Sequence, residues 1–136
     1  MQKLKIKLPT LATLSLLTLV ACLSSDTTNG QVFLDDVKGT VVEFKVNGEV
    51  YGHEKFDANG RDVTWQYIEG KCLTGTVEIV HGQICYTYPE LGPVWSKSCY
   101  VGISDSTNYK FYSPEVGKTQ IFEATKTSQT QLSCSN

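Results

Sequence analysis

The sequence has few of the residues from which catalytic and metal sites are commonly built. Histidine occurs twice, at His53 and His81, and no two cysteines have the CxxC spacing of a structural zinc site. Neither the HExxH motif of zinc proteases nor the GxSxG motif of serine hydrolases is present. We therefore expect no catalytic residue, no metal site and no cofactor.

An excess of basic charge is also absent. The formal net charge of the 136 residues is −2, and removal of Lys3, Lys5 and Lys7 with a signal peptide would lower it to −5. Proteins that bind nucleic acid usually carry a clear positive excess. The composition therefore predicts no nucleic-acid partner.

The sequence has one long hydrophobic run, at residues 8–21, and it is too short to span a bilayer as a permanent helix. Three lysines precede this run, and the sequence LVAC ends it at Cys22. This order resembles the lipobox of bacterial lipoproteins, in which the cysteine receives acyl chains such as palmitate and becomes the first residue. We expect a lipoprotein signal peptide at 1–21, with an ordinary secretory signal as the alternative.

The predicted cellular location follows from this segment. Acyl chains on Cys22 would hold the protein on a membrane without a spanning helix. Leu23 stands where an aspartate would indicate retention in the inner membrane of Gram-negative bacteria. We expect an outer-membrane lipoprotein that faces the periplasm, with a periplasmic or cell-surface location as the alternative. Residues 22–34 should form a flexible tether, and residues 35–136 a single β domain.

Apolar and polar residues alternate with the period of a β-strand through most of the remaining sequence. The clearest segments are residues 40–46, 49–56, 61–68, 72–80 and 83–90, and further ones lie at 98–104, 109–113 and 119–125. Short turns such as Asn47-Gly48 and His81-Gly82 separate them, and no helical pattern follows the signal peptide. The sequence predicts an antiparallel meander of seven or eight strands that closes into a small or half-open barrel, with a β-sandwich as the alternative.

Four cysteines remain once Cys22 is assigned to the lipid. An even number in a small exported domain indicates two disulfides. Cys85 and Cys99 lie symmetrically about Gly92, so they should face each other across a hairpin. We therefore predict a Cys85–Cys99 bridge, and Cys72–Cys134 follows by elimination.

Residues 51–72 contain most of the ionisable and polar side chains that could serve a catalytic site. The strand pattern, however, does not predict that these side chains converge on one site. His53 and Glu54 are neighbours on one predicted strand, so they should point to opposite faces of the sheet. Asp57 and Asn59 belong to a turn. The aromatic residues Trp65, Tyr67 and Tyr86 should lie in the core or line the mouth of the barrel, where a ligand could bind. Gly52 and Gly75 should mark bulges or sharp bends in their strands.

The stretch from residue 38 to 100 contains a series of short motifs: Gly39-Thr40, Tyr51-Gly52 with Glu54 and Phe56, Arg61 with Val63 and Trp65, Gly70 with Cys72 and Gly75, Ile84-Cys85-Tyr86 with Tyr88, and Cys99-Tyr100. In this pattern the stretch resembles an uncharacterised family of small exported proteobacterial proteins. The resemblance implies export and a small β fold, and it implies no chemistry. The lipobox and the tail with Cys134 depart from the family pattern.

These observations favour a lipid-anchored binding or interaction module of the cell envelope, with a protein, a glycan or a small apolar ligand as its partner. A small envelope hydrolase is the alternative from another class. The size, anchor and strand content also resemble those of lipoprotein barrels that inhibit lysozyme, although the SG-RY type of loop with which they block the lysozyme cleft is not present.

Overall fold

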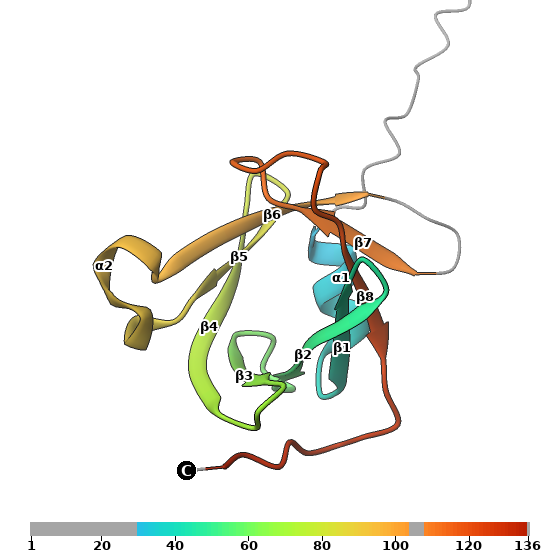
Figure 1. The fold of residues 1–136 in the computed structure, drawn as a ribbon, viewed down its shortest axis with the longest axis vertical. Coiled ribbons are helices and arrows are strands. Elements are labelled where there is room, and N and C mark those ends of the chain that lie inside the picture. Colours follow the sequence, from blue (N-terminus) through green and yellow to red (C-terminus); the bar gives the residue numbers. More distant parts are fainter. Residues whose placement is uncertain (1–29, 104–107, 136) are drawn as a thin grey trace, which may run out of the picture.

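The computed structural model describes residues 30–103 and 108–135, which form a closed barrel of eight antiparallel strands (Figure 1). Each strand pairs with the next one along the chain, and the last pairs with the first. This confirms the predicted all-β meander and its closure. The strands are β1 (Val41–Val46), β2 (Glu49–Phe56), β3 (Asp62–Tyr67), β4 (Cys72–Val80), β5 (Gln83–Thr87), β6 (Lys97–Ile103), β7 (Tyr109–Tyr112) and β8 (Phe122–Lys126).

Two hairpins are closed by the two-residue turns that the sequence predicts. Asn47 and Gly48 have φ angles of 53° and 82°, and His81 and Gly82 have φ angles of 49° and 78°. Positive φ at both central residues is typical of the type I′ turn, whose twist matches that of the paired strands. These turns fix the register of β1 against β2 and of β4 against β5.

A helix that the sequence analysis did not predict covers one end of the barrel. This helix, α1 (Gly30–Val37), starts where the Gly30 N–H donates to the Gly82 carbonyl at 2.9 Å, and it ends just before β1. It therefore crosses the end at which β1 begins, which we call the closed end; Figure 1 shows it beside β1, β7 and β8. The expectation of a tether is wrong for residues 30–34, because they belong to helix α1, whose side chains Phe33 and Leu34 are buried.

Tertiary packing explains why an eight-residue segment without strong helical signals is helical. Phe33, Leu34 and Val37 are buried, and Phe33 is fully covered. The ring of Phe33 meets the rings of Phe111 and Tyr109 at centroid distances of 4.7 and 4.9 Å. A helix this short has little stability of its own, so its stability comes mainly from burial of this apolar face against the barrel.

Both predicted disulfides are present. Cys85 and Cys99 are directly paired in the register of β5 and β6, and the connection between these strands holds the short helices η1 (Pro89–Leu91) and α2 (Gly92–Trp95). The Cys72–Cys134 bridge fastens the C-terminal segment at residues 127–135 to the start of β4. Beside it, the Ser135 N–H donates to the Gly70 carbonyl at 2.9 Å.

No helix among residues 30–103 and 108–135 is long and apolar enough to cross a membrane. The predicted signal peptide, the lipidation site Cys22 and residues 23–29 of the predicted tether lie outside the described residues.

Candidate ligand-binding cavity

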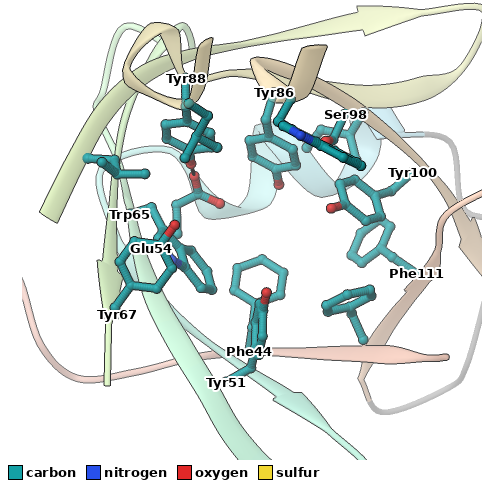
Figure 2. Close-up of a pocket in the computed structure, with 15 residues that line it drawn as sticks. Phe44, Tyr51, Glu54, Trp65, Tyr67, Tyr86, Tyr88, Ser98, Tyr100 and Phe111 are labelled. Atoms are coloured by element: carbon teal, nitrogen blue, oxygen red, sulfur yellow. Dashed lines mark hydrogen bonds between the residues drawn. The ribbon is translucent and has the colours of Figure 1, made fainter. Parts of the chain in front are cut away.

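The inward-facing side chains leave the barrel partly hollow. A cavity of about 260 Å³ lies towards the end opposite α1, which we call the open end (Figure 2). Its walls come from all eight strands and from the β5–β6 connection. The lining residues are Phe44, Tyr51, Glu54, Trp65, Tyr67, Leu73, Ile84, Tyr86, Tyr88, Leu91, Trp95, Ser98, Tyr100, Phe111 and Phe122.

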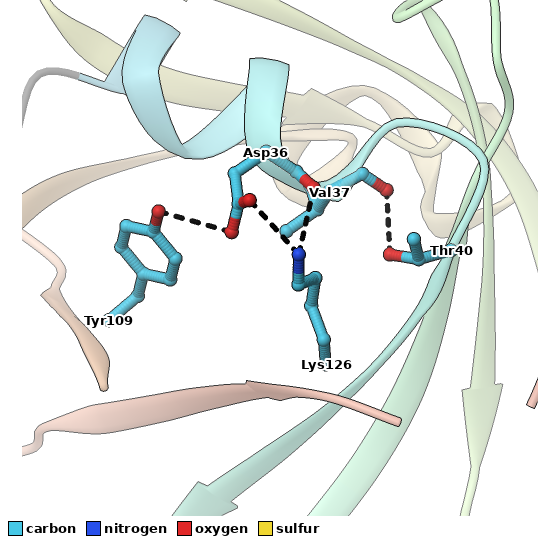
Figure 3. Close-up of polar contacts among 5 residues, drawn as sticks. All are labelled: Asp36, Val37, Thr40, Tyr109 and Lys126. Atoms are coloured by element: carbon cyan, nitrogen blue, oxygen red, sulfur yellow. Dashed lines mark hydrogen bonds and ion pairs between the residues drawn. The ribbon is translucent and has the colours of Figure 1, made fainter. Parts of the chain in front are cut away.

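The closed half of the barrel is filled. Its apolar side chains come from α1 and from the strand ends next to it, and they include Phe33, Val37, Phe56, Val63 and Val77. Polar contacts hold the helix in place: Tyr109 donates to Asp36 Oδ2 at 3.2 Å, and Lys126 pairs with Asp36 Oδ1 at 3.0 Å (Figure 3). The helix and this packed core form the floor of the cavity.

Seven aromatic side chains form a nearly continuous wall around the cavity, which we call the aromatic belt. Neighbouring ring centroids in this belt lie 5.4 to 6.3 Å apart. Most of these pairs are tilted or edge to face, the arrangements that aromatic rings prefer. In order around the wall, the belt consists of Tyr67, Trp65, Tyr51, Phe122, Tyr100, Tyr86 and Tyr88.

Trp65 lies in this wall because Gly52 makes room for it. A Cβ atom on Gly52 would lie 2.3 Å from Trp65 Cζ2 and 2.7 Å from the Gln66 carbonyl oxygen. The register of β1 against β2 shifts at Phe44, directly opposite Gly52, so the expected bulge is confirmed. Tyr51 is the extra residue of this bulge, and its ring lines the cavity with its centroid 5.5 Å from that of Trp65.

Glu54 places a carboxyl group inside this aromatic wall. Its side chain comes from the middle of β2 and the residue is 2% exposed. The Tyr88 hydroxyl donates a hydrogen bond to Glu54 Oε1 (Figure 2). The hydroxyl of Tyr86 also acts on the carboxyl group, and it lowers the pKa of Glu54. Burial raises the pKa of Glu54 to about 8, and the two tyrosine hydrogen bonds hold it from rising further.

The expectation that His53 and Glu54 diverge is confirmed. His53 lies on the outer face, with Nε2 3.5 Å from Glu43 Oε2, whereas Glu54 points inwards. Asn59 completes a turn by accepting from the Arg61 and Asp62 N–H groups, as its place in the sequence indicates. The polar residues of this stretch therefore do not converge, and Glu54 alone among them lines the cavity.

The structure brings the three predicted ligand-binding residues, Trp65, Tyr67 and Tyr86, together in one wall. Sequence analysis missed Glu54 as a member of the site. The signal was available, because period-two alternation puts Glu54 on the same face as Phe56, which is fully buried. It also missed Tyr51, Tyr88, Tyr100 and Phe122, which complete the aromatic belt.

Exposed apolar side chains gather at the open end. All but one of the large hydrophobic residues that stand exposed in the described chain belong to the connections or strand ends there; Val32 of α1 is the exception. Trp95 is 73% exposed and also lines the cavity. The open-end group comprises Val50, Tyr51, Ile68, Leu91, Val94, Trp95 and Val116.

This arrangement supports binding of a small molecule. A dry apolar cavity of about 150 Å³ is already large enough to take up benzene, so the present cavity admits a larger ring system or a short branched chain. Apolar walls with a few fixed polar groups are typical of ligand sites. Comparisons with protein-family models, with curated proteins and with solved structures found no match to this chain.

Proposed function

We propose that this protein is a binding module of the bacterial cell envelope that takes a small, mainly apolar ligand into its barrel through the open end. The observation that carries the proposal is the cavity of about 260 Å³ with its aromatic belt. A β domain that served solely as a scaffold would gain stability by filling this space, because each unfilled volume costs packing energy.

The apolar residues at the open end support the same function. Leu91 and Trp95 line the cavity and are also exposed, so they lie on the path between solvent and the interior. Exposed apolar groups that collect at one place on a small protein usually mark a contact site. An apolar ligand that enters here would cover them, together with Tyr51.

The predicted lipid anchor determines the proposed cellular location of this module. A lipid on Cys22 would hold the barrel at the outer membrane, facing the periplasm, and a ligand bound there would be kept within the envelope. This part of the proposal depends on the sequence LVAC at residues 19–22 and on the length and composition of the segment before it.

The cavity can be tested with a neutral fluorescent probe, N-phenyl-1-naphthylamine, whose emission rises in apolar surroundings. We expect saturable binding of one probe per protein, accompanied by a change in tryptophan emission, because the two tryptophans of the chain both line the cavity. Absence of saturable binding would contradict the proposed function.

A pair of variants locates the probe. Ser98 is a small residue in the cavity wall, so Ser98→Phe should fill part of the cavity and weaken probe binding at least about tenfold. Ser128 is exposed on the C-terminal segment, outside the cavity, and Ser128→Phe should bind the probe as the wild type does. Equal weakening by both changes would mean that the probe binds elsewhere.

A further inference from the structure

We propose that the ligand is an organic cation, an ammonium group on a small apolar body, and that the carboxylate of Glu54 is its counter-ion within the aromatic belt. This inference rests on the proposed function and names the chemical class of its ligand. It is carried by the position of Glu54: a buried carboxyl group that faces a cavity with aromatic walls.

Glu54 has no positive partner among the residues that the structure describes. Among the described residues that line the cavity there is no lysine, arginine or histidine, and none of the ion pairs between described residues includes Glu54. A buried carboxylate without a cation is unfavourable, and most proteins avoid it. A bound ammonium group would supply the missing charge.

Two hydroxyl groups hold the Glu54 carboxyl in place before any ligand arrives. Tyr88 and Tyr86 donate to it, so the ionised form is partly stabilised and its oxygens have a fixed direction. Hydrogen bonds to a carboxylate favour its charged form. The pair of tyrosines therefore fixes the carboxyl group and favours its ionised form without supplying a positive charge.

The walls suit a cation as well. The faces of aromatic rings carry negative potential and attract ammonium groups, and aromatic cages recognise quaternary ammonium ligands in this way. Tryptophan is the most effective ring, and Trp65 lies in the wall beside Tyr51 and Phe44. An anionic ligand would meet the Glu54 carboxylate instead, with no described positive side chain in the cavity to offset it.

Cation binding should be linked to loss of a proton from Glu54. The titratable groups that face it are tyrosine hydroxyls, that of Tyr86 on β5, that of Tyr88 directly after β5 and that of Tyr100 on β6. Burial raises the pKa of all three above its usual value, so they remain neutral donors. Glu54, with a pKa of about 8, is then the group in this cavity that changes charge between pH 5 and 9.

A pair of probes of equal shape isolates the charge. Phenyltrimethylammonium is a permanent cation, and tert-butylbenzene is its neutral counterpart with carbon in place of nitrogen. Both can be measured by displacement of N-phenyl-1-naphthylamine. We expect the cation to bind at least about tenfold more tightly than the neutral molecule at pH 8. Its affinity should rise about tenfold for each pH unit up to pH 8 and then level off, because proton release from Glu54 accompanies binding.

Variants assign the effect to the carboxyl group. Glu54→Gln keeps an acceptor for Tyr88 but removes the charge, so the preference for the cation and its pH dependence should both disappear. Glu78→Gln removes a carboxylate that is exposed on β4 and paired with Lys97, and it should behave as the wild type. Tyr88→Phe should move the levelling-off point to higher pH, because the Glu54 carboxylate loses a donor.

The possible results separate the two proposals. Binding of tert-butylbenzene without any preference for phenyltrimethylammonium, or an equal preference in Glu54→Gln, would overturn the cation proposal and leave the binding module intact. Absence of displacement by either molecule, together with absence of probe binding, would overturn both. If Glu54→Gln does not fold, the pH profile of the wild type and the shift in Tyr88→Phe decide the matter.

Discussion

Glu54 and Tyr88 are 34 residues apart in the sequence, and the Tyr88 hydroxyl donates directly to the Glu54 carboxyl group inside the barrel. The contact joins β2 to the segment that follows β5, two regions that are not neighbours in the sheet. It also keeps an ionisable group away from water. The protonation state of Glu54 is therefore tied to the stability of the barrel.

The first prediction concerns stability against pH. Glu54 has an ordinary pKa of 4.5 when unfolded and about 8 when folded, so between these values the folded state holds the extra proton. The stabilising contribution of Glu54 is thus complete below pH 4.5 and is lost as the pH rises to 8, by about 3 to 5 kcal/mol. Urea unfolding of wild type and Glu54→Gln from pH 4 to 9 measures this.

The difference between the two unfolding curves is the informative quantity, since all other titrating groups are shared. The difference in free energy of unfolding between Glu54→Gln and the wild type should shift in favour of Glu54→Gln as the pH rises, and this shift should stop above pH 8. Glu78→Gln is the control, and its difference from the wild type should stay within about 1 kcal/mol throughout. A constant difference for Glu54→Gln would show that Glu54 titrates normally.

The second prediction concerns Gly52 and the indole that lies over it. Gly52→Ala forces a methyl group to within 2.3 Å of Trp65, so the ring must move or the strand must shift. We expect a loss of about 1 to 3 kcal/mol of stability together with a changed near-ultraviolet circular dichroism spectrum and weaker probe binding.

Gly48→Ala serves as the comparison. Gly48 has a φ angle of 82° and open space around it, so alanine there strains the turn but touches nothing in the cavity. This variant should lose stability without any change in the tryptophan signal or in probe binding. Normal spectra and normal binding in Gly52→Ala would contradict the described fit between Gly52 and Trp65.

Strand order, closure and disulfide pairing could be predicted because their signals are local. Each signal can be recognised within a short stretch of sequence: the period-two alternation, the turns at Asn47-Gly48 and His81-Gly82, and the symmetry of Cys85 and Cys99. In a meander every strand pairs with its neighbour, so these local signals add up to the whole sheet.

The remaining features depend on contacts that are distant in sequence. The sequence around Glu54 does not reveal that its carboxyl group is buried, because its tyrosine partners Tyr86 and Tyr88 lie more than 30 residues further along the chain. The bulge at Gly52 also disturbs the alternation, so Tyr51 and Glu54 both line the cavity although they differ by an odd number of positions. Helix α1 was missed because its stability comes from the barrel that it covers.

The third prediction distinguishes the two disulfides. Each bridge restricts the unfolded chain, by about 3 kcal/mol for the loop between Cys85 and Cys99 and by about 4 kcal/mol for the longer one between Cys72 and Cys134. Replacing both Cys72 and Cys134 with serine should also free residues 127–135 from the barrel. Hydrogen exchange should then show faster exchange in that segment, while the strand amides remain protected. Loss of protection throughout the strands would contradict this.

The fourth prediction concerns the anchor. If Cys22 is lipidated, the wild type should incorporate labelled palmitate and sediment with membranes, and Cys22→Ala should do neither. Ser24→Ala, two residues further on, is the control and should leave both properties unchanged. A Cys22→Ala protein that still carries label and still sediments would contradict the proposed lipoprotein.

The last prediction tests whether helix α1 is an integral part of the folded barrel. Phe33 is fully buried against the rings of Phe56, Phe111 and Tyr109, so Phe33→Ala should cost about 3 to 5 kcal/mol of stability. Val32, its neighbour, is 57% exposed, and Val32→Ala should cost less than about 1 kcal/mol. Thermal unfolding of the two variants under non-reducing conditions gives the comparison. A tether over residues 30–34 would make both changes neutral, whereas a helix that closes the barrel makes the first severe and the second mild, because one side chain faces the core and the other faces solvent.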